Sequence, residues 1–285
     1  MYPPLPLRTT GRKAGPAKMA DGGKPTVVPE STGGVLTFWE HLDVLRSSLL
    51  RIVAAVAVMA VVAFALKTEL FAVVLAPRTS QFVTYRLLGI GPFSLHLMNT
   101  GLTEQFMIHM RTALYAGLLA ASPYVLYELF RFVSPGLYRQ ERRYAVWLVG
   151  AAYVMFLVGT LVNYFVVFPL TVRFLGTYQV SPDVANMLTL QSYVDTLLGM
   201  SLVMGVVFEL PVVSGLLGRL GLIDGTLMTT YRRHAVVAIL VVAAVITPTT
   251  DVFTLLVVAL PIYLLYEASI VIVRLVHPKE ANNNN

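Results

Sequence analysis

The feature that most constrains this chain is the run of residues 144–172, which contains no charged side chain. A membrane-spanning helix needs about 20 apolar residues, because it rises about 1.5 Å per residue through a hydrocarbon core about 30 Å thick. The whole sequence agrees, with 56% hydrophobic and only 13% charged residues, about half the charged share of soluble domains. The sequence therefore predicts an all-α integral membrane protein.

Five further apolar segments accompany this run. The six predicted spans are residues 49–66, 107–127, 144–168, 196–218, 235–250 and 252–273. Pro123 is expected to interrupt the second, and the fifth and sixth are expected to be short and to thin the bilayer locally. We predict a concave six-helix membrane domain over residues 36–274. A disordered Pro- and Gly-rich tail (1–35) precedes it, and a short tail (275–285) follows.

Residues 36–50 have their apolar side chains on one helical face, which predicts an amphipathic helix. Thr37 and Glu40 form the T-x-x-E pattern of a capping box at its start. A helix of this kind in front of a span usually lies in the membrane interface. We therefore expect a separate interfacial helix before the first span.

Basic residues predict the topology. With the N-terminus inside, eleven Lys and Arg residues near the membrane lie on the cytoplasmic side and four on the other, as the positive-inside rule requires. We expect both termini in the cytoplasm of a bacterial or archaeal cell, with the chain in its cytoplasmic (inner) membrane. Because the basic residues flank the spans, the net charge of +6 indicates lipid headgroups and topology, not nucleic acid.

Glu209 and Pro211 lie within the predicted fourth span. An ionisable residue in hydrocarbon is costly and is a functional candidate by default. The alternative is a protonated carboxyl that bonds to a neighbouring helix and acts as packing glue. Pro211 deprives the carbonyl of Val207 of its helical donor, so a kink with a polar notch is expected there.

The loop 131–143 carries four arginines and Glu141. Its arginines are explained by positive-inside anchoring, but this role needs no carboxylate. Glu141 either pairs with Arg142 or Arg143, or offers bidentate hydrogen bonds to a cationic partner. The acids of the first helix, Glu40 and Asp43, are either its solvated face or part of a site.

Other polar residues are assigned structural roles. Asp251 is expected to cap the sixth helix, and Pro77 and Glu104 to shape an external loop and a helix end. The sequence has no cysteine, and its five histidines are scattered without metal-ligand spacing. We therefore expect neither an enzyme nor a metal site or cofactor.

Several motifs together resemble one family. In chain order they are "EHLDVLR", "FVSPGLYRQERR", "YFVVFPL", "MGVVFELPV", "TPTTDVF" and "ALPIYLLYE". They are similar to the TatC family, the polytopic core of the twin-arginine protein translocase, from about residue 36 to 274. The resemblance implies six spans, both ends in the cytoplasm, and transport of folded proteins.

The resemblance also implies roles for the loop. Glu141 would meet the paired arginines of a signal peptide, with Phe132 and Arg142 in the same patch. The family's second carboxylate comes from HLxELR, but here Val44 stands at the Glu position and Asp43 one place before it. One residue corresponds to a rotation of about 100° around a helix, so Asp43 points to another side than Val44, whereas Glu40 lies one turn before Val44 and nearer its face. Either Glu40 or Asp43 would supply the second carboxylate.

For the fourth span, the resemblance implies a groove that binds partners. Glu209 and Pro211, with Thr247 on span five, would receive the single-span proteins TatA and TatB. Leu255 stands where the family often has Gln, which makes the polar cluster thinner. Lipid and further copies of the chain are additional expected partners.

Three other readings remain open at the level of sequence. A secondary transporter or small-solute channel is the main one, although the spans offer few polar groups besides Asn163, Glu209 and Glu267. A membrane enzyme would lack a catalytic constellation, and a purely structural scaffold would leave Glu141 and Glu209 unexplained.

Overall fold

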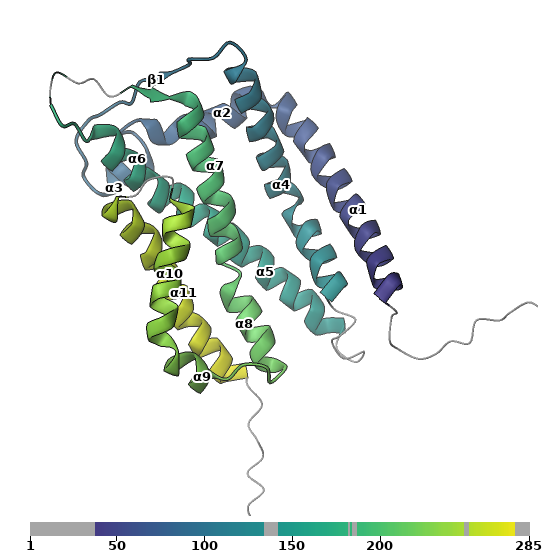
Figure 1. Ribbon diagram of the computed structural model, residues 1–285. Helices are drawn as coiled ribbons and strands as arrows, with labels where there is room; N and C mark the ends of the chain where they lie inside the picture. Colours follow the sequence, from purple (N-terminus) through teal and green to yellow (C-terminus); the bar gives the residue numbers. More distant parts are fainter. Residues whose placement is uncertain (1–37, 134–141, 182, 184–186, 248–250, 277–285) are drawn as a thin grey trace, which may run out of the picture.

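The structure is a computed structural model that describes residues 38–133, 142–181, 183, 187–247 and 251–276 (Figure 1). In this part of the chain the fold is helical apart from one short strand pair. The long elements are α1 (Phe38–Ala65), α4 (Glu104–Val133), α5 (Arg142–Val162), α7 (Leu190–Val207), α10 (Arg232–Ile246) and α11 (Val252–Val276). The short helices are α2 (Lys67–Leu75), η1 (Ala76–Arg78), α3 (Val83–Leu87), η3 (Asn163–Val167), α6 (Phe168–Thr177), α8 (Leu210–Arg219) and α9 (Gly225–Thr230).

Within the described residues, five helical stretches are long and apolar enough to cross a membrane. They are Leu42–Ala65, Glu104–Phe132, Trp147–Thr177, Leu190–Arg219 and Val252–Val276. The fifth predicted span corresponds to α10, which has 15 residues and is about 22 Å long, less than a hydrocarbon core. The count of six spans therefore stays a prediction.

Three predictions about the helices were wrong. The region before the first span is not a separate interfacial helix, because α1 runs from Phe38 to Ala65 without a break (Figure 1). Pro123 lies inside α4 and does not end it. The sixth span is not short, since α11 has 25 residues and is about 37 Å long.

The helices run between two ends of the bundle. α2, α3 and β1 (Leu97–Met98) lie at one end, the cap end, whereas the start of α1 and the end of α11 lie together at the other (Figure 1). We call the latter the arginine end, because Arg131, Arg219 and Arg274 lie in the last turns of α4, α8 and α11. The two described chain ends thus lie on one side of the bundle, as the N-in, C-in prediction requires.

The cap end is held by neutral hydrogen bonds and aromatic packing. Tyr85 is fully buried, and its hydroxyl donates to the carbonyls of Pro77 and Pro169 at 3.0 and 2.9 Å. Burial raises the pKa of this phenol above its ordinary value, and nearby Arg173 offsets the rise in part. Tyr85 therefore stays a neutral donor that joins α3 to the segments before it and to α6.

Small residues bring the helices close together. A Cβ on Gly117 of α4 would lie 2.5 Å from the backbone nitrogen of Ala60 on α1, and one on Gly159 of α5 would lie 2.6 Å from the carbonyl oxygen of Met204 on α7. Such contacts are typical of helix pairs in membranes, where lipid is as apolar as Leu and close backbone packing stabilises association. The pair α1–α4 therefore depends on Gly117.

Replacing Gly117 with alanine should lower the free energy of unfolding by about 1–3 kcal/mol, the usual cost of overpacking. The measurement is reversible unfolding in mixed micelles. Gly150→Ala is the matched control, because a Cβ there meets nothing within 4 Å and alanine favours a helix over glycine. Equal losses in both variants would contradict the role of the α1–α4 contact.

Candidate functional site: the break at Glu209 and the arginine end

The predicted kink lies between α7 and α8. The amide of Phe208 still donates to Met204, but that of Glu209 turns to the carbonyl of Val206, three residues back, at 3.1 Å. α8 then begins at Leu210 with Pro211 in its first turn, where a missing N–H costs nothing. The carbonyl of Glu209 accepts from the amides of Val212 and Val213 at 3.0 and 2.9 Å. The backbone thus restarts the helix after two residues, Phe208 and Glu209.

The side chain of Glu209, unlike its backbone carbonyl, lacks a hydrogen-bond partner within the described residues. Both carboxylate oxygens are buried, and neither forms a hydrogen bond within the described part of the chain. The neighbouring Phe208 and Val212 pack into two separate apolar clusters, the first with α10 and α11 and the second with α4 and α5. A buried carboxyl without a donor is expensive, and this cost makes Glu209 a candidate functional residue.

Thr247 and Leu255, the other two residues of the predicted polar cluster, do not pair with the carboxyl of Glu209. Thr247 ends α10 and is buried, but its hydroxyl donates back to the carbonyl of Ala244 at 3.4 Å. Leu255 packs against the apolar cluster of α7, α10 and α11. Among the described residues, no hydrogen bond therefore joins Glu209 to Thr247.

At the arginine end, the structure describes only part of the predicted patch. Glu141 lies outside the described residues, as do the side chains of Glu40 and Arg142. Asp43 and Val44 are exposed near the start of α1, and Phe132 is half-buried at the end of α4. The described members therefore lie at the same end of two helices that pack together.

Sequence reasoning missed Glu128, a buried carboxylate among the described residues of this end. Its side chain is only 2% exposed although it carries a charge. Ser48 donates to Oε2 at 2.9 Å, whereas Arg51 and the hydroxyl of Tyr124 donate to Oε1 at 3.0 and 3.1 Å. Arg131 lies 3.6 Å from the same oxygen. Glu128 thus joins α1 to α4 through both carboxylate oxygens.

A signal for this cluster was present in the sequence. Tyr124, Glu128 and Arg131 follow helical spacing, and Ser48 and Arg51 are three residues apart on α1. The predicted second span ends at residue 127, so Glu128 falls just outside it and before the loop 131–143. The pairing itself depends on how α1 docks onto α4, which no local pattern specifies.

The residues expected in structural roles occupy three turns. Oδ1 of Asp251 accepts the amide of Thr254 at 2.6 Å and so caps α11. Oε2 of Glu104 accepts the amides of Thr100 and Gly101 at 2.9 and 2.8 Å, and its Oε1 accepts that of Gln191 at 3.2 Å. Glu104 therefore ties the external loop before α4 to the start of α7. The carbonyl of Pro77 is one of the two acceptors of Tyr85.

The loop before α4 and the loop before α7, which Glu104 joins, also pair as short strands. β1 and β2 (Leu188–Thr189) are parallel, with Leu97 opposite Leu188 and Met98 opposite Thr189. Together with Glu104, this pair connects the loop before α4 to the loop before α7.

Two further ion pairs join helices. Arg111 of α4 pairs with Asp195 of α7 at 3.1 Å. Arg232 of α10 binds Glu267 of α11 at 2.7 Å, and Tyr263 donates to the same carboxylate at 2.9 Å. Glu267, which the sequence left as an intramembrane charge, is therefore neutralised by its neighbours.

Comparison with known proteins decides the family. The profile of the family described as "Sec-independent protein translocase protein (TatC)" matches residues 40–261. The chain belongs to the TatC family. Its sequence-based assignment to that family is thereby confirmed, and a role in Sec-independent protein translocation follows from it.

Individual relatives agree with the family match. A TatC protein of Deinococcus radiodurans is 34% identical over 245 residues, 85% of this chain and 88% of that protein. One of Koribacter versatilis is 40% identical over 177 residues, 62% of this chain and 65% of that protein. A crystal structure described as the twin arginine translocase receptor TatC superposes with a TM-score of 0.69 at 30% identity, covering 83% of this chain and 99% of the other.

The Glu128 cluster predicts a stability difference. Glu128→Gln should lower the free energy of unfolding by about 1–3 kcal/mol, because Arg51 and Ser48 would lose a charged acceptor in a buried place. The same change at Glu267, which is 29% exposed, should cost less than about 1 kcal/mol. Unfolding in mixed micelles measures both. A larger loss for Glu267→Gln would contradict the assignment of Glu128 as the main link.

Proposed function

We propose that this protein is the receptor and core of a twin-arginine translocase. It would bind the signal peptides of folded cargo at the arginine end and assemble with single-span TatA- and TatB-type partners in the inner membrane. Family membership over residues 40–261 supports translocation over transport of a small solute. The observation that carries the partner role is the buried, unpartnered carboxyl of Glu209.

In this proposal Glu141 receives the paired arginines of the signal. Phe132 offers an apolar surface beside it, Arg142 belongs to the same patch, and Asp43 or Glu40 supplies a second carboxylate near Val44. A guanidinium presents a planar fork that matches a carboxylate, whereas an ammonium is a point charge. Arginine selectivity would therefore arise from bidentate bonding at Glu141.

The break between α7 and α8 would be the place where a partner helix docks. A polar side chain on that helix would bond to Glu209 and remove the cost of its unpartnered oxygens. Pro211 supports this role by starting α8 directly after Glu209, and Thr247 would belong to the same polar groove. Both termini would lie in the cytoplasm, beside the arginine end.

Replacing the two signal arginines by lysines should weaken peptide binding by about 1–3 kcal/mol, the range for hydrogen bonds to charged groups. The measurement is titration of a labelled signal peptide with the purified protein in mild detergent. Glu141→Ala should remove the difference between the two peptides. Glu267→Gln removes a charge elsewhere on the chain and should preserve it, and equal affinity for both peptides in the unmodified protein would refute the receptor role.

Glu209→Ala should abolish transport that requires the partners but leave signal-peptide binding unchanged, because the break lies away from the arginine end. Transport into membrane vesicles, with and without the single-span proteins, measures the first effect. Glu209→Gln keeps hydrogen bonding without the charge, so it should retain part of the transport. Normal transport by the alanine variant would show that the carboxyl serves packing alone.

A further inference from the structure

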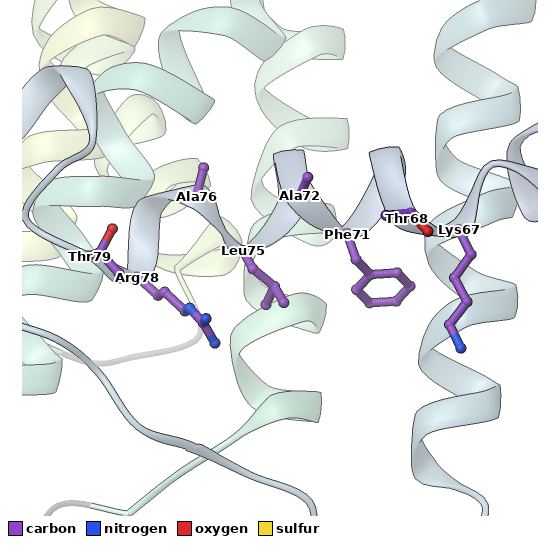
Figure 2. Close-up of a pocket in the computed structure, with 8 residues that line it drawn as sticks. All are labelled: Lys67, Thr68, Phe71, Ala72, Leu75, Ala76, Arg78 and Thr79. Atoms are coloured by element: carbon purple, nitrogen blue, oxygen red, sulfur yellow. The ribbon is translucent and has the colours of Figure 1, made fainter.

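A pocket of about 620 Å³ lies along α2 at the cap end. Its walls include Lys67, Phe71, Leu75 and Arg78, whose side chains extend from the same side of the helix (Figure 2). Their spacing of four, four and three residues places them on one face. The pocket therefore has a cation at each end and an apolar floor between them.

These two cations differ from most of the others near the helix ends. Arg51, Arg111 and Arg232 each pair with a carboxylate. Lys67 and Arg78 form neither an ion pair nor a side-chain hydrogen bond within the described residues, and both are exposed. Glu69, the acid on α2, is not among the lining residues. The pocket thus has an uncompensated positive charge.

The position of α2 is the one expected of a helix that lies in the membrane interface. It starts two residues after Ala65, where the first 24-residue span ends, and it lies across the bundle instead of along it (Figure 1). The hydroxyls of Tyr164 and Tyr193 donate to the carbonyls of Val73 and Val74 on α2 at 2.8 and 3.1 Å. Tyrosines gather at the headgroup level of membranes, so the pocket is placed where lipid phosphates are found.

We infer that this face of α2 is a binding site for an anionic phospholipid of the leaflet at the cap end. The guanidinium of Arg78 would hold a phosphate, and Lys67 would attract the negative headgroup from the other end. Phe71 and Leu75 would contact the glycerol and the first acyl carbons. Free phosphate lacks that apolar part, which is why the pocket favours lipid.

The inference does not depend on the receptor role at the arginine end. A lipid bound here would sit against α2, directly beside the carbonyls that anchor Tyr164 and Tyr193, and would cover the exposed cations of the cap. Each basic residue near a charged surface contributes about 1 kcal/mol, or about a fivefold preference for anionic lipid. Two such residues should give a preference that single substitutions reduce stepwise.

The test uses the full chain in bilayer nanodiscs of phosphatidylcholine containing spin-labelled phosphatidylglycerol. Electron spin resonance measures the fraction of motionally restricted label at the protein surface. Lys67→Gln and Arg78→Gln should each lower the preference for phosphatidylglycerol about fivefold, and the double variant should approach the value for labelled phosphatidylcholine. Lys67→Arg keeps the charge and should keep the preference.

Arg86→Gln is the matched control, because Arg86 is an exposed cation on α3 at the same end but does not line the pocket. It should leave the preference unchanged, and an equal loss there would overturn the site in favour of diffuse charge. A double variant that keeps the wild-type preference would also overturn it. Displacement of the label by millimolar inorganic phosphate would instead identify a free-anion pocket.

Discussion

The break between α7 and α8 is the feature on which the packing of this bundle depends most. In hydrocarbon a backbone group without a partner costs several kcal/mol, so a proline within a span must be accommodated locally. The chain does this by a tightened turn at Glu209, whose carbonyl accepts two amides of α8. α7 can then pack on α5 through Gly159 and Gly205, while α8 packs on α11 through Gly215 and Gly218.

The cap end combines two kinds of polar link. Tyr85, Tyr164 and Tyr193 each donate a hydroxyl to a backbone carbonyl, and the carboxylate of Glu104 accepts the amides of Gly101 and Gln191. Carboxylates hold helices together elsewhere, at Glu128 and Glu267. A carboxylate that accepts several hydrogen bonds tolerates burial, whereas Glu209 has none among the described residues. That contrast separates structural acids from the one proposed to serve a partner.

The cap end also contains the face of α2 that is proposed to bind a membrane lipid. α2 places unmatched cations at headgroup level, while Glu104 fixes the loops around it through the amides of Gly101 and Gln191. A rigid cap with a bound lipid would keep α2 at one depth and thereby hold the end of α1 in place. This matters because α1 packs chiefly on a single neighbour, α4, and has most of its apolar surface exposed.

The sequence by itself determined the membrane class, the family and the kink at Pro211, because uncharged length, motif order and a missing N–H are local properties. It also located Asp251 as a cap, since that bond reaches only three residues. Only the tertiary structure decided that α1 is one helix and that α4 continues through Pro123. It also decided that Glu128 and Glu267 are paired, whereas Glu209 has no partner among the described residues. Those outcomes depend on which helices dock side by side, and burial and ion pairing between residues 35 to 80 positions apart leave no periodic trace in a chain read alone.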